Sequence, residues 1–197
     1  MKHLNIFQRI IACALVANTG AAFAQHPGHA PASAAASPYA GQQAREVKAL
    51  SPTQTADLLE GKGMEQAKAA ELNGYPGPMH VLELAERLAL SATQLRDSEA
   101  LLATHKAEAR ALGARLVEAE RRLDAAFAGK QIDTAQLELL TRQIGLRQAE
   151  LRASHLRTHL QQTRLLTAPQ VALYAELRGY TGTPGTAAPA QHSSPSH

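Results

Sequence analysis

The amino-acid sequence predicts an all-α fold, an elongated antiparallel helical hairpin with flanking shorter helices. Three observations lead to this prediction. A cassette that favours helix starts, Leu-[Ser/Thr]-x-x-Gln, occurs three times between residues 50 and 170. Apolar residues in this region recur at spacings of three and four, without an alternating strand pattern. Glycine and proline are mostly confined to the joints between helical segments.

Residues 1–24 have the features of a cleavable signal peptide. Lys2 and Arg9 make the start basic, an apolar run covers residues 10–16, and Ala22-Phe23-Ala24 supplies small residues for cleavage. No later segment approaches the roughly 20 apolar residues of a membrane-spanning helix. We therefore expect export to the periplasm, cleavage after Ala24 and no membrane insertion.

Composition divides the remaining chain into three parts. Residues 25–49 are rich in Ala, Pro, Ser and Gln, and residues 181–197 contain Gly, Pro, Ser and His, so both are predicted to be disordered. Residues 50–180 form the predicted helical domain. Without Lys2 and Arg9, 18 basic residues stand against 17 acidic ones, so the exported chain is nearly neutral.

Each cassette is predicted to form a capping box. The Ser or Thr hydroxyl accepts a hydrogen bond from the backbone N–H three residues on, and the Gln side chain returns to the N–H of the cap. The capping residues are Leu50, Ser51 and Gln54, then Leu90, Ser91 and Gln94, and finally Leu166, Thr167 and Gln170.

The joints divide the domain into successive helices. We predict a first helical region over residues 52–72, weakened at Gly61 and Gly63. The later helices are expected over residues 79–88, 92–128, 134–165 and 168–179. The first long helix would span about 55 Å, whereas a compact domain of this size measures about 36 Å, which favours an elongated hairpin.

Apolar residues follow two patterns on the long helices. The first long helix has one heptad-like seam, made by Leu95, Ser98, Leu102, His105, Ala109, Leu112, Leu116, Ala119, Leu123 and Ala126. The second has two apolar faces, of which one contains Leu139, Leu146, Ala149, Ala153, Leu156 and Leu160. One hairpin partner cannot cover both faces. A homodimer or an exposed apolar cradle for unfolded client proteins would account for the second face.

The three cassettes resemble those of the periplasmic LTxxQ family, which includes the chaperone-like Spy and CpxP proteins, zinc-associated ZraP and the metal sensor CnrX. The resemblance covers residues 50–180. Residues 71–80 and 177–180 are similar to segments of metal-sensor-like members. The resemblance implies a helical fold and a periplasmic stress role, in metal response or as a chaperone. The third cassette departs from the two-cassette pattern of Spy and CpxP.

Three histidines are the main metal candidates. His155 and His159, four residues apart, lie on one helix face, and a hairpin loop centred near residue 131 places His105 opposite them. With Glu108, water or a partner subunit as the fourth ligand, they would suit Zn, Ni, Co or Cu. The alternative is that these histidines are hydrogen-bonded or partly exposed among leucines.

Other possible ligands have simpler explanations. Met64, Met79 and His80 would suit copper, although methionine more often fills a core. Histidines in the two terminal segments could capture metal or be polar linker residues; they are His26, His29, His192 and His197.

The sequence gives no support for two classes of function. Nucleophile elbows, phosphate-binding glycine loops and the His-Glu-x-x-His motif are missing from it, so an enzyme is not expected. The arginines of the second long helix surround it, which argues against nucleic-acid binding. We expect a periplasmic protein that binds a divalent transition metal and buffers it or reports it to an envelope-stress sensor. An ATP-independent chaperone is the alternative.

Overall fold

The computed structural model describes residues 36–181, and this part of the chain is all-helical. The predicted signal peptide and terminal histidines lie outside the described residues. The chain divides into two compact units, residues 1–40 and 41–197. Of the first unit only residues 36–40 are described, where the Ala40 N–H donates to the Ser37 carbonyl at 2.9 Å. Among the described residues, no helix has the length and apolar character needed to cross a membrane.

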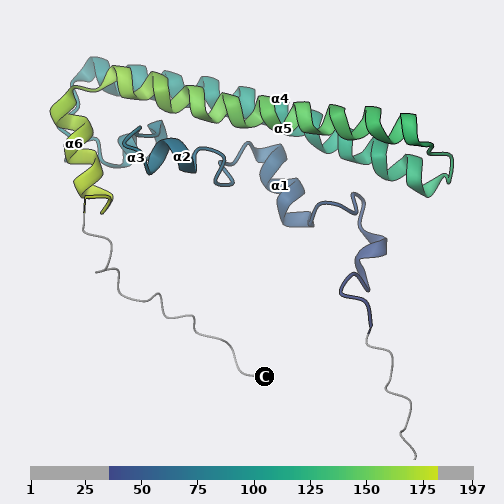
Figure 1. Cartoon of the computed structure of the whole chain (residues 1–197). Helices are drawn as coiled ribbons and strands as arrows, with labels where there is room; N and C mark the ends of the chain where they lie inside the picture. The colour runs from purple at the N-terminus through teal and green to yellow at the C-terminus, as the bar shows by residue number, and fades with distance from the viewer. Residues whose placement is uncertain (1–35, 182–197) are drawn as a thin grey trace, which may run out of the picture. The chain divides into compact units, whose positions relative to one another are not determined.

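Within the described residues 41–181, the second unit consists of one short 3-10 helix followed by six α-helices (Figure 1). Their bounds are η1 Gln42–Ala44, α1 Pro52–Glu60, α2 Lys68–Glu71, α3 Pro78–Glu83, α4 Ala92–Ala128, α5 Thr134–Leu165 and α6 Ala168–Leu177. The long helices α4 and α5 have the predicted bounds. Figure 1 shows them side by side, and α1 to α3 lie along them.

The short helices differ from the prediction in three places. The region predicted as one helix over residues 52–72 is divided, because Gly61 ends α1 in the left-handed conformation with a φ of 70°. Met64 and Glu65 also have positive φ angles, so the chain turns before α2 begins. The helix predicted over residues 79–88 is α3, Pro78–Glu83, followed by turns. The last helix ends at Leu177 rather than Gly179.

All three cassettes form capping boxes. Ser51, Ser91 and Thr167 each accept a hydrogen bond from the backbone N–H of the glutamine three residues on, and each glutamine side chain accepts from the cap N–H. Two of the glutamines also bond to each other, since Gln94 Nε2 donates to Gln170 Oε1 at 2.7 Å. The starts of α4 and α6 are therefore connected by a hydrogen bond between their capping glutamines.

The interface between α4 and α5 changes character along its length. Hydrogen bonds connect Gln94 to the Leu165 carbonyl and Gln162 to Ser98, so the two helices run in opposite directions. Towards the loop the interface is apolar, formed by Leu112, Leu116, Val117, Ala119, Ile144 and Leu151. Nearer the start of α4 it is polar, formed by Ser98, His105, Ser154, His155, Thr158 and Gln162, all buried. The predicted seam position Leu95 is instead exposed.

The segment before α1 is packed against α4. Residues 25–49 were predicted to be a disordered linker, but Val47 is only 2 % exposed and belongs to the apolar core with Leu58 and Leu112. Lys48 forms an ion pair with Asp124 at 2.9 Å. Burial of the Val47 side chain accounts for this difference, and residues 25–35 lie outside the described part of the chain.

A second apolar cluster lies where α3, the second cassette and α6 meet. Val81, Leu88, Leu166 and Tyr174 form its buried centre. Gln170 Nε2 donates to the Leu88 carbonyl at 3.1 Å, which fixes the start of α6 next to this cluster. The first cluster holds α1 against α4, the second holds α3 next to α6, and α2 contacts α5.

Candidate metal site

His105 and His155 form a buried pair between α4 and α5. His105 Nε2 lies 3.0 Å from His155 Nδ1, and the rings meet edge to face, with centroids 4.5 Å apart and an interplanar angle of 78°. The side chains are almost fully removed from solvent. The helical spacing brings them together, because position 105 on α4 lies opposite position 155 on the antiparallel α5.

The pair shares one proton across its hydrogen bond. Whichever ring donates, one of the two outer nitrogens, His105 Nδ1 or His155 Nε2, keeps a lone pair and the other carries hydrogen. Both outer nitrogens are buried and have no hydrogen-bond partner among the described residues. Burial lowers the pKa of His105, and burial together with the neighbouring His105 lowers the pKa of His155 to about 4. Both rings are therefore neutral at neutral pH.

His159 lies one turn after His155 and faces a different set of groups. Its Nδ1 lies 2.7 Å from the Tyr75 carbonyl oxygen, which can only accept, so Nδ1 carries a proton and the neutral tautomer of this ring has its lone pair on Nε2. The ring packs on the backbone of Gly77, where an added Cβ would lie 2.9 Å from Nε2. A backbone carbonyl that fixes the tautomer in this way is typical of histidines that ligate metals.

The three histidines line one cavity of about 860 Å³. α4 and α5 form one wall, and the segment from the end of α1 to α3 forms the other. The lining residues with possible ligand atoms are His80, His105, His155, His159, Met64, Met79, Glu60, Glu65 and Glu71. Within residues 36–181, however, no three His, Cys, Asp or Glu side chains already stand where they could hold a metal ion.

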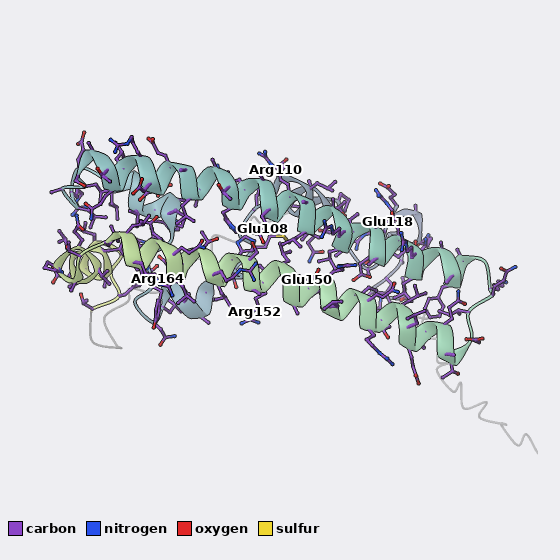
Figure 2. The ribbon with its side chains drawn as sticks, turned by 90° about the horizontal axis from the view of Figure 1, so that it is seen from above. Glu108, Arg110, Glu118, Glu150, Arg152 and Arg164 are labelled. Atoms are coloured by element: carbon purple, nitrogen blue, oxygen red, sulfur yellow. The ribbon has the colours of Figure 1, made fainter. Side chains whose placement is uncertain are left out.

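The other predicted ligands have separate positions. Glu108, labelled on α4 in Figure 2, has a partner other than metal. It forms an ion pair with Arg157 of α5 at 3.0 Å. Met64 packs against the apolar core, which agrees with the core-filling alternative, whereas the Met79 side chain is 48 % exposed at the cavity. His80 lies 3.8 Å from Glu71. His26, His29, His192 and His197 lie outside the described residues.

Glu71 is the residue of this region that the sequence did not identify as functional. Its Oε1 accepts hydrogen bonds from the hydroxyls of Tyr174 and Tyr180, and Arg178 Nε lies 3.5 Å away. Burial and the Glu71 carboxylate raise the pKa of Tyr174 well above its ordinary value. A signal was present, because residues 71–80 and 177–180 were both noted as similar to segments of metal-sensor-like proteins, and the structure brings these two segments into contact.

Comparisons with protein-family models, curated proteins and solved structures find no match to this chain.

Proposed function

We propose that this protein binds a divalent transition metal in the cavity through His105, His155 and His159, and that it buffers the metal or reports it in the periplasm. The observation that carries the proposal is the buried, neutral His105–His155 pair beside a third histidine whose Nε2 keeps its lone pair. Neutral imidazole is a preferred ligand of Zn, Ni, Co and Cu(II).

The residues fit such an ion in chemistry and spacing. Two nitrogen ligands of tetrahedral zinc, each about 2.0 to 2.1 Å from the metal, lie about 3.3 Å apart. The facing nitrogens of His105 and His155 lie 3.0 Å apart, so a small separation of the rings would admit a metal between them, with the shared proton moving to the outer nitrogen of its own ring. A movement of the His159 ring that keeps its Nδ1–H on the Tyr75 carbonyl would bring Nε2 into a three-histidine set, and the need for this movement is consistent with the lack of a preformed group among the described residues.

The proposal predicts that calorimetry will detect zinc or nickel binding to the full chain with His26, His29, His192 and His197 replaced by alanine. His105→Ala and His155→Ala should each weaken binding by about 10- to 100-fold, because each removes one ligand. Arg152→Ala, at an exposed position of α5 that does not line the cavity, is the control and should bind like the parent. Binding should persist below pH 6.5, since burial holds the pKa of the pair below its ordinary value. Equal affinities in all variants would contradict the proposal.

A homodimer would cover the exposed face of α5. Leu139, Leu146 and Leu160 are 53 %, 54 % and 43 % exposed, and their separations are multiples of seven residues, which places them on one stripe of the helix. Exposed stripes of this kind mark surfaces for a partner. We infer that a second copy of the hairpin packs there, and unfolded clients are the alternative occupant.

Light scattering at micromolar concentration distinguishes these occupants. The wild-type chain should have twice the monomer mass, and Leu139→Glu/Leu146→Glu should be monomeric, because two charges cannot be buried without partners. Lys130→Glu, on the loop and away from the stripe, is the control. A monomeric wild-type chain that prevents aggregation of an unfolding enzyme would instead support an ATP-independent chaperone.

A further inference from the structure

Glu71 connects the wall of the cavity to the last helix. Its Oε1 accepts from the Tyr174 hydroxyl at 2.5 Å and from the Tyr180 hydroxyl at 3.0 Å. Tyr174 lies on α6 and is 1 % exposed, and Tyr180 lies three residues after the end of α6. One carboxylate oxygen of α2 thus holds both phenols of the C-terminal segment.

The second oxygen of the same carboxylate lies near His159. Glu71 Oε2 is buried, has no hydrogen-bond partner within residues 36–181, and lies 3.6 Å from His159 Nδ1. The carboxylate charge is shared by both oxygens, but the phenols and Arg178 lie at Oε1, so Oε2 is a buried acceptor whose contact is the long one with His159. The other charged or titratable neighbours, His80 and Arg178, lie 3.8 and 3.5 Å from Oε1 rather than Oε2.

Building on the proposed metal site, we propose that metal binding at His159 and the docking of α6 strengthen each other through Glu71. A dication held by His159 would attract Oε2 and fix the carboxylate in the orientation in which Oε1 accepts from Tyr174 and Tyr180. The coupling works in both directions, because any effect of the metal on α6 requires an equal effect of α6 on metal affinity. The C-terminal segment would thus report whether the site is filled.

The first test measures zinc affinity by calorimetry in the full chain lacking the four terminal histidines. Tyr174→Phe/Tyr180→Phe keeps both rings and removes both hydroxyls, and it should weaken binding by about 5- to 10-fold. Tyr75→Phe is the matched control, because the Tyr75 hydroxyl is not part of the Glu71 cluster while its carbonyl still bonds to His159. Its affinity should equal that of the parent.

The second test measures amide hydrogen exchange in α6 with and without zinc. Zinc should slow exchange of the α6 amides several-fold in the parent and have little effect in Glu71→Gln, which retains an acceptor but loses the charge. Zinc binding with unchanged α6 exchange and equal affinity in the tyrosine variant would overturn the coupling and leave the metal site standing. Absence of zinc binding to the parent would overturn both proposals.

Discussion

Gly113→Ala is expected to displace α1 from α4 and to lower the free energy of unfolding by about 2 to 3 kcal/mol. A Cβ at this position would lie 2.1 Å from the Leu58 carbonyl oxygen and 2.7 Å from its carbonyl carbon. Both are backbone atoms, so no side-chain rotation relieves the clash, and α1 must move as a whole. Leu58, 4 % exposed in the core, would lose much of its burial. Urea unfolding followed by circular dichroism measures the change.

Gly145→Ala is the matched control for this prediction. Gly145 lies within α5, and an added Cβ would meet no atom within 4 Å. Alanine should therefore stabilise the protein by up to about 1 kcal/mol through helix propensity alone. If both alanine variants were stabilised alike, the close approach of α1 to α4 at Gly113 would not exist in solution.

Acid is expected to weaken the fold through the His105–His155 pair. The folded protein holds both rings neutral, whereas the unfolded chain protonates them at the ordinary pKa of 6.5, so the unfolded state binds more protons below that pH. Stability is thus full above pH 6.5 and falls as the pH approaches 4, the value near which His155 protonates in the folded state. The loss from His155 alone should reach about 3 kcal/mol at pH 4, and the lowered pKa of His105 adds to it in the same direction.

The variant His105→Leu/His155→Leu isolates this effect from the acid titration of surface carboxylates. Replacing both partners by apolar side chains of similar size removes the titration and leaves no unpaired polar group from the pair. Urea unfolding from pH 7 to pH 4, with a chelator present, should give a shallower decline in the variant than in the wild type. Parallel curves for the two proteins would contradict a neutral buried pair.

The bounds of the long helices were predictable because their signals are local. Ser91 and Asp133, both residue types that favour helix N-caps, cap α4 and α5, and Gly129 lies where α4 ends. The break between α1 and α2 was harder to locate, since Met64 and Glu65 adopt positive φ angles that residues other than glycine rarely favour. The close contact of α1 with α4 at Gly113 was not predicted, because a glycine within a helix gives no local signal that another helix packs against it.

The candidate site was predictable only where helix periodicity determines it. Register alone placed His105 level with position 157, two residues from its observed partner His155. Periodicity gives no information about the side chains that the short helices bring to α5. The contacts of His159 with Tyr75 and Glu71 depend on how residues 61–78 turn. Glu108 forms an ion pair with Arg157 of the facing helix, a partner that was not predicted from the sequence.

The hydrogen bonds between the capping glutamines of α4 and α6 explain why these two cassettes contain Gln rather than Glu. Either Glu or Gln completes an isolated capping box, since only an acceptor oxygen is needed. Gln94 and Gln170 also use their Nε2 groups, which donate to each other's Oε1 and to the carbonyls of Leu165 and Leu88. A carboxylate has no hydrogen to donate, and two of them would repel each other. At these two positions the cassette therefore encodes a specific long-range pairing between segments 76 residues apart, in addition to the start of a helix.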